Sequence, residues 1–180
     1  MITGITFIDL PLLIIIIIGI IKLVCAYTNK IWEIRHYIDK FNRPTKECYV
    51  SQIKKRLGTF SNSATSNSIM SYITFLEKDG VSFKFWDYER YPLNNTYSEP
   101  IDFDFHCIAS SGKTLSATAV MYGETSQVML DDEYVVDEFI ELLQTNKSLR
   151  IIISSGLSEY RFTLKRGNFN KVFKSLPKNK

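Results

Sequence analysis

The first part of the chain differs in hydrophobic pattern from all that follows. Ile5 to Tyr27 is a 23-residue stretch in which only Asp9 and Lys22 carry charge. As a helix with a rise of ~1.5 Å per residue, it would be ~34 Å long, enough to cross the apolar core of a bilayer. The pattern therefore predicts a membrane-directed segment at residues 1–27 and one separate domain at residues 28–180.

Two interpretations of this segment remain open. It is either an uncleaved transmembrane anchor or a signal peptide whose apolar stretch ends at Val24-Cys25-Ala26. No Lys or Arg precedes the apolar stretch, whereas a signal peptide usually begins with positive charge. We therefore favour an anchor that places residues 5–27 in the membrane.

Two features of the sequence disagree about the side of the membrane on which the domain lies. Positive charges at Lys22, Lys30 and Arg35 follow the segment, and the positive-inside rule would place the domain in the cytoplasm. Cys48 and Cys107 could instead form a disulfide in an oxidising compartment, or they could be buried free thiols. We expect a single-pass protein with a periplasmic domain; a cleaved, secreted or periplasmic form and a cytoplasmic-facing domain are the alternatives.

Beyond residue 28 the dominant pattern is alternation of apolar and polar positions, which is typical of half-buried strands. Residues 31–38 and 101–108 alternate strictly, and residues 69–77 and 81–88 predict a hairpin turned by Asp79-Gly80. Further strands are predicted at 48–57, 114–122, 127–130, 149–153 and 159–164. The polar stretches 58–68 and 89–100 are predicted to be loops.

Only one long segment has helical spacing. Asp131 and Asp132 precede apolar residues that recur with helical period from Val135 to Leu143, which predicts an amphipathic helix. A short helix is predicted at residues 169–176. The fold class that follows is mainly β: a β-sandwich or flattened barrel of about eight antiparallel strands with one amphipathic helix, preceded by an N-terminal hydrophobic helix.

Charge and candidate chemistry add little to this outline. The chain has 22 basic and 19 acidic residues in interspersed positions, which argues against nucleic acid as a partner. Asp102, Asp104 and His106 share one face of a strand, but a solvated sheet face explains them better than a metal or acid–base site. His36 shares a face with apolar residues and is predicted to lie in the core. We expect no catalytic residues, no metal and no cofactor.

The remaining candidates for function are the polar stretch 58–68 and the loop 88–98, because loops on a rigid β scaffold commonly carry binding residues. Aromatic and amide side chains in them could form a recognition edge. These candidate binding residues are Phe60, Asn62, Asn67, Tyr88, Tyr91 and Tyr97.

Two ends of the domain carry a set of short sequence features. They are Trp32-Glu33-Ile34, Asp39-Lys40-Phe41, the helix 135–143, the strands 149–153 and 160–164, and Gly167-Asn168-Phe169. This set resembles small exported bacterial β-sandwich accessory proteins of the invasion-associated locus B and type VI secretion accessory types. The resemblance implies a periplasmic or surface module that binds other proteins, with no catalytic residue to carry over.

Together these features predict a non-enzymatic binding or accessory domain of the bacterial envelope. It would be membrane-anchored or exported and would act through contacts with an envelope or membrane protein. An immunity or phage-encoded inhibitor protein is one alternative function. A hydrolase whose site is assembled from scattered residues is the other.

Overall fold

The computed structural model describes residues 13–20, 30–77, 80–93, 99–123, 125–156 and 158–177. The chain divides into two units, Met1–Lys30 and Ile31–Lys180. In the first unit residues 13–20 are helical. Among the described residues, no helix has both the length and the apolar character needed to cross a bilayer. The flanking residues of the predicted segment 5–27 lie outside the described part of the chain.

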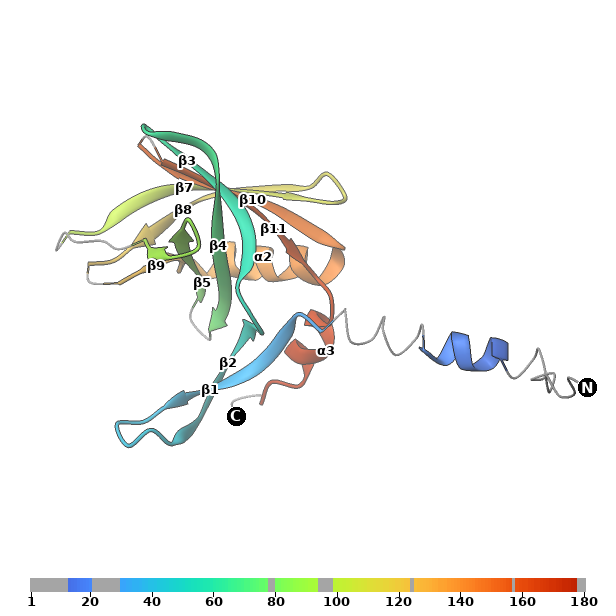
Figure 1. Cartoon of the computed structure of the whole chain (residues 1–180). Helices are drawn as coiled ribbons and strands as arrows, with labels where there is room; N and C mark the ends of the chain where they lie inside the picture. Colours follow the sequence, from blue (N-terminus) through green and yellow to red (C-terminus); the bar gives the residue numbers. More distant parts are fainter. Residues whose placement is uncertain are drawn as a thin grey trace, which may run out of the picture. The chain divides into compact units, whose positions relative to one another are not determined.

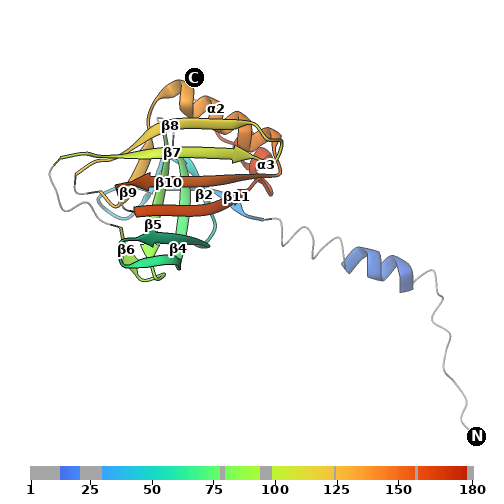
Figure 2. The same ribbon diagram turned by 90° about the horizontal axis from the view of Figure 1, so that it is seen from above.

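The second unit is a closed antiparallel barrel of eight of the described strands (Figure 1). Around the barrel, each strand pairs with the next in the order β4, β3, β11, β10, β7, β8, β9 and β5, and β5 pairs with β4 to close it. Figure 2 shows β8, β7, β10 and β11 side by side on one wall. The barrel strands are β3 (Arg56–Asn62), β4 (Thr65–Glu77), β5 (Gly80–Asp87), β7 (Ile101–Ala109), β8 (Thr114–Met121), β9 (Gln127–Leu130), β10 (Ser148–Ser155) and β11 (Ser158–Lys165). Of the two architectures expected from the sequence, the barrel is confirmed.

Aromatic side chains fill the inside of the barrel. The ring of Phe162 lies 5.6 Å from that of Phe83 and 5.7 Å from that of Phe85, and Phe85 stacks on Tyr160 at 4.8 Å. All four side chains are buried. An eight-stranded barrel is just wide enough for side chains to fill it. The interior is therefore a packed core.

Helix α2 (Glu133–Thr145) packs its apolar face against the core. Asp132 begins the helix by accepting a hydrogen bond from the backbone N–H of Val135, as expected of an N-cap. Phe139 is fully buried, and its ring lies 6.0 Å from Phe83 and 5.9 Å from Phe105. The predicted amphipathic helix is confirmed, and its apolar face contributes to the barrel core.

Two glycines permit close contacts between neighbouring barrel strands. A Cβ on Gly58 would lie 2.6 Å from the carbonyl oxygen of Arg161, and a Cβ on Gly80 would lie 2.7 Å from that of Leu130. Such distances are far below van der Waals contact, so a side chain at either position would push β3 from β11 or β5 from β9.

A hairpin of β1 (Trp32–Ile38) and β2 (Pro44–Gln52) extends from the barrel (Figure 1). It is joined to the barrel through β4, whose 13 residues pair with β3 in the first half and with β2 near the end. A two-residue strand, β6 (Tyr91–Pro92), pairs with the end of β5. The short helix α3 (Phe169–Lys174), which was expected from its spacing, follows the last barrel strand.

Asn168 binds the open edge of β1. The backbone N–H of Ile53 donates to the carbonyl of Ile31, so the N–H and C=O of Trp32 point away from β2. The Asn168 side chain takes up both: Oδ1 accepts from Trp32 N at 2.9 Å, and Nδ2 donates to Trp32 O at 2.8 Å. Oδ1 also accepts from Ile31 N at 2.7 Å, and the Trp32 ring meets Phe169 edge-on at 5.3 Å. We call these contacts the Asn168 clamp.

Three sequence-based expectations are corrected here. Residues 58–68, predicted to be a loop, form most of β3 and the start of β4, where Phe60 and Met70 point into the core and the polar residues between them obscure the strand pattern. His36 is exposed, and its Nδ1 lies 3.0 Å from the carbonyl oxygen of Thr45, so it is not a core residue. The strand predicted at residues 48–57 has other bounds, because β2 runs from Pro44 to Gln52 and residues 56 and 57 begin β3.

The clamp predicts a specific loss of stability. Asn168→Ala removes three hydrogen bonds to backbone groups, two of them on the buried residue Trp32, and we expect ~2–3 kcal/mol of destabilisation. The midpoint of urea unfolding measures it. Asn170→Ala is the control, because its side-chain amide donates one hydrogen bond, to Gln144 O, and should cost ~1 kcal/mol. Equal midpoints for the two variants would contradict a special role for Asn168.

Candidate functional site

A groove of about 510 Å³ opens in the described surface. Its walls come from the β1–β2 hairpin, the end of β4, strand β9, helix α2, and α3 with the residues that follow it. The groove residues are Tyr37, Lys46, Glu47, Cys48, Leu76, Glu77, Met129, Val136, Asp137, Ile140, Phe173, Leu176 and Pro177. This volume lies within the range of sites that bind small molecules or peptide side chains.

The floor of the groove is apolar. Leu76 and Val136 are buried, and Ile140, Phe173 and Leu176 are partly buried against the core. Met129 contributes a flexible side chain that can adapt to differently shaped ligands. The floor therefore offers a hydrophobic surface to which α2, α3 and β4 all contribute.

The rim of the groove is acidic. Glu47, Glu77 and Asp137 line it together with one cation, Lys46. Helix α2 reinforces the negative charge, because residues 131–146 contain six acidic side chains and no Lys or Arg. A ligand that carries positive charge beside apolar groups would complement this site.

Tyr37 reports the electrostatic character of the rim. The pKa of the Tyr37 phenol is raised to about 12, first by burial, then by the charge and hydrogen bonding of Glu77, with smaller contributions from Tyr49 and Glu47. The ring of Tyr37 packs on that of Tyr49 at 4.9 Å, and Tyr49 lies 6.0 Å from Phe75 of β4. These rings connect the hairpin to the barrel beside the groove.

The candidate residues from the two polar stretches are not brought together into one recognition edge. Phe60 is 2% exposed and packs against Tyr88 and Tyr160, so it belongs to the core and not to a binding loop. Asn62 accepts hydrogen bonds from the backbone of Ala64 and Thr65 and so shapes the β3–β4 turn.

The other candidates are exposed or outside the described residues. Asn67 has a φ of 51°, and its N–H donates to Ser61 Oγ. Tyr88 and Tyr91 are exposed at 52% and 66%, near the turn that follows β5. Tyr97 lies outside the described residues.

The face of Asp102, Asp104 and His106 is solvated, as predicted. All three side chains are exposed on β7, and His106 Nδ1 lies 2.9 Å from Ser116 Oγ on the neighbouring strand. Among the described residues no three His, Cys, Asp or Glu side chains are grouped as metal ligands.

The two cysteines do not pair. Cys48 and Cys107 are free thiols, Cys48 half-buried in the groove wall and Cys107 fully buried in the core. Burial, with a contribution from the charge of Glu138, raises the pKa of Cys107 to about 12. A thiol with so high a pKa is not reactive as a thiolate at neutral pH.

Sequence reasoning missed the groove because its residues come from five separate elements. The acidic start of α2 is the one local signal of the groove's charge, and by itself it indicates only the beginning of a helix. Comparison with protein-family models, curated proteins and solved structures finds no match.

The link between Tyr37 and Glu77 predicts a measurable shift. Glu77→Gln removes a negative charge beside the phenol, and we expect the pKa of Tyr37 to fall while staying above its ordinary value of 10.0, because burial remains. Titration of the Cζ carbon of Tyr37 by NMR follows this change. Glu47→Gln is the control and should have a smaller effect; an equal shift in both variants would show that Glu77 has no special contact.

Proposed function

We propose that the barrel is a non-enzymatic binding domain of the bacterial envelope that holds a protein partner in the groove. The partner would present a segment with Lys or Arg beside apolar side chains. The observation that carries this proposal is the combination of an apolar floor and an acidic rim in one groove of about 510 Å³.

The chemistry of the groove favours such a segment over other ligands. Apolar side chains gain free energy by leaving water, at ~25 cal/mol per Å² of area buried, so the floor supplies affinity. Charge pairs at a partly exposed rim add less affinity, but they reject partners of the wrong sign and guide the right one into place. Three carboxylates against one lysine select a cationic partner and disfavour an anionic one.

The position at a membrane is proposed from the sequence. The apolar stretch at residues 5–27 would anchor the chain, with the barrel on the periplasmic side. The resemblance of the two ends of the domain to exported accessory proteins supports the same compartment. A binding barrel held at a membrane suits an accessory role beside an envelope protein.

Binding of a defined peptide tests the groove. We expect an amphipathic Leu/Lys peptide to shift the amide NMR resonances of the hairpin, α2 and α3, and the matching Leu/Glu peptide to leave them unchanged. Reversing two rim charges, with Glu77→Lys and Asp137→Lys together, should weaken the Leu/Lys peptide about 10-fold, or ~1.4 kcal/mol.

Asp102→Lys with Asp104→Lys is the matched control, because it makes the same change of net charge on an exposed face of β7. This variant should bind the Leu/Lys peptide like the parent chain. Equal loss in the two double variants, or shifts spread over the outer face of β7, would rule out the groove as the binding site.

N-terminal sequencing of the mature protein tests the anchor. We expect the chain from membranes to keep residues 5–27, because this stretch is longer than the ~7–15 apolar residues of a signal-peptide core. Membrane association should persist in high salt, since apolar insertion does not depend on charge. A mature chain that begins near Ala26 or Tyr27 would show instead that the segment is a cleaved signal peptide.

A further inference from the structure

We propose that the tip of the β1–β2 hairpin, residues 37–46, is a second membrane contact that inserts into the headgroup region of a bilayer containing anionic phospholipid. The base of the tip includes two groove residues, Tyr37 and Lys46, whereas residues 38–45 at its far end do not line the groove. The inference goes beyond the binding of a protein partner. It shares with the proposed function only the position of the chain at a membrane.

The tip is a structured turn. Asp39 Oδ1 accepts the backbone N–H groups of Phe41 at 2.8 Å and Arg43 at 2.9 Å. The N–H of Asn42, which has a φ of 61°, donates to the carbonyl of Asp39. A salt bridge of 3.0 Å joins Arg43 to the Asp39 carboxylate. The backbone of the turn thus fixes the directions in which its side chains point.

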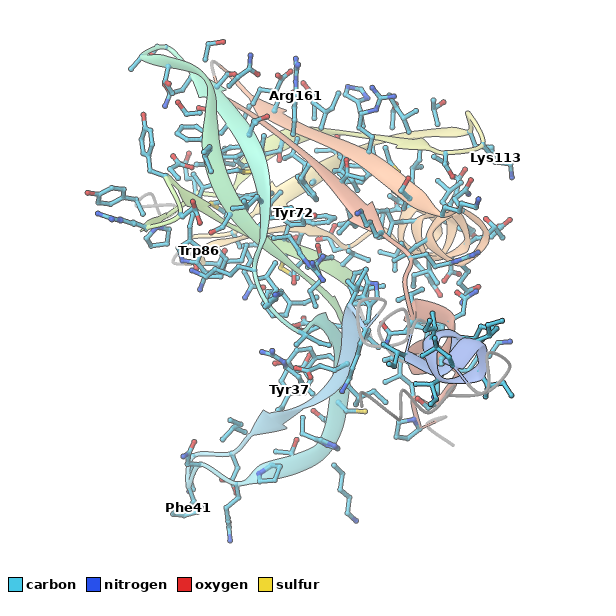
Figure 3. The ribbon with its side chains drawn as sticks, turned by 45° about the vertical axis from the view of Figure 1, so that its right-hand side comes forward. Tyr37, Phe41, Tyr72, Trp86, Lys113 and Arg161 are labelled. Atoms are coloured by element: carbon cyan, nitrogen blue, oxygen red, sulfur yellow. The ribbon has the colours of Figure 1, made fainter. Side chains whose placement is uncertain are left out.

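Large apolar side chains are exposed on this turn. Ile38 and Phe41 are each 64% exposed, and Tyr37 is 37% exposed. Figure 3 shows Phe41 at the far end of the hairpin, away from the barrel. Apolar side chains at a protruding turn cannot be buried in the protein's own core. Their burial requires contact with another molecule or with a membrane.

Positive charge surrounds Phe41. The Nζ of Lys40 lies 5.1 Å from the centre of the Phe41 ring, and the guanidinium carbon of Arg43 lies 5.0 Å from it. Lys46 is also exposed on the same hairpin. Between residues 39 and 46 three cations stand against one carboxylate, that of Asp39. This arrangement complements the negative charge of anionic headgroups.

The shape of the tip favours a lipid surface over a protein partner. A protein would need a matching concave pocket for a single protruding ring, whereas a fluid bilayer adapts around a convex apolar point. An aromatic or aliphatic side chain with cations beside it is the composition that interfacial membrane contacts use. One such contact is weak, which suits a chain that also has an apolar N-terminal segment.

Vesicle binding by residues 31–180 tests the inference. This part is a compact unit by itself, and the strand pairings and core side chains described above all lie within it, so it should fold alone. We expect it to sediment with vesicles of phosphatidylcholine and phosphatidylglycerol and less with phosphatidylcholine alone. Ile38→Ser with Phe41→Ser should weaken this binding at least 10-fold. Lys40→Gln should reduce the preference for phosphatidylglycerol, because it removes a cation beside Phe41 that does not line the groove.

Leu57→Ser with Ile69→Ser is the matched control, because these two apolar side chains are exposed to a similar degree, 64% and 55%, on β3 and β4. The control should bind vesicles like the parent. Equal weakening of both serine pairs, unchanged binding of the tip pair, or no binding of the parent domain would overturn the inference.

Two further measurements separate the possible sources. Phe41→Trp should show fluorescence quenching by brominated lipid acyl chains beyond that of the parent, and inorganic phosphate should not displace the domain; displacement by phosphate would show a free-anion site instead. The Leu/Lys peptide should bind the tip pair normally. If the parent domain binds the peptide but not the vesicles, only the tip proposal fails, and if it binds the vesicles but not the peptide, only the groove proposal fails.

Discussion

Asn168 satisfies the open edge of β1 as a neighbouring strand would. Its side-chain amide forms hydrogen bonds with the backbone N–H and C=O of Trp32. These two groups point away from β2 because of the register in which β1 and β2 pair. The contact joins positions 136 residues apart, so it ties the two ends of the domain together across the fold. Because α3 begins at the next residue, the same contact fixes the hairpin and α3 as two walls of one groove.

Buried aromatic side chains fill the described interior of the barrel. Phe83, Phe85, Phe105 and Phe162 occupy its interior, and Phe139 of α2 packs against them. The candidate site therefore lies outside the barrel, where β4 runs on past β3 to pair with β2. One long strand thus serves as part of the closed core and as the support of the projecting hairpin. The groove inherits its rigidity from the core beneath it.

Much of the fold could be predicted from local pattern. Strict alternation in β7 placed Phe103, Phe105 and Cys107 inside, and the Asp79-Gly80 turn gave the β4–β5 hairpin. The serine-rich residues 58–68 were wrongly predicted to be a loop. The outer face of these barrel strands is polar there, and Phe60 is the only large apolar residue within 58–68. Closure of the barrel was beyond local pattern, since it depends on pairings such as β5 with β9 and β11 with β3.

The site was less predictable than the fold for the same reason. Tyr37, Glu77, Asp137 and Phe173 are far apart in sequence, and each looks ordinary in its own element. Only the path of the chain brings an acidic helix and an apolar floor together. His36 shows the converse, because an apparently apolar face on β1 is solvated where the hairpin leaves the barrel.

The central claim is that this groove is where the partner binds. A photo-crosslinking amino acid at Ile140 in living cells tests it most directly, with the same group at Asp104 on the outer face of β7 as the reference position. We predict one crosslinked protein from position 140, reduced when Glu77 and Asp137 are both lysine, and absent from position 104. The same products from both positions, or a product from position 104 alone, would contradict the account.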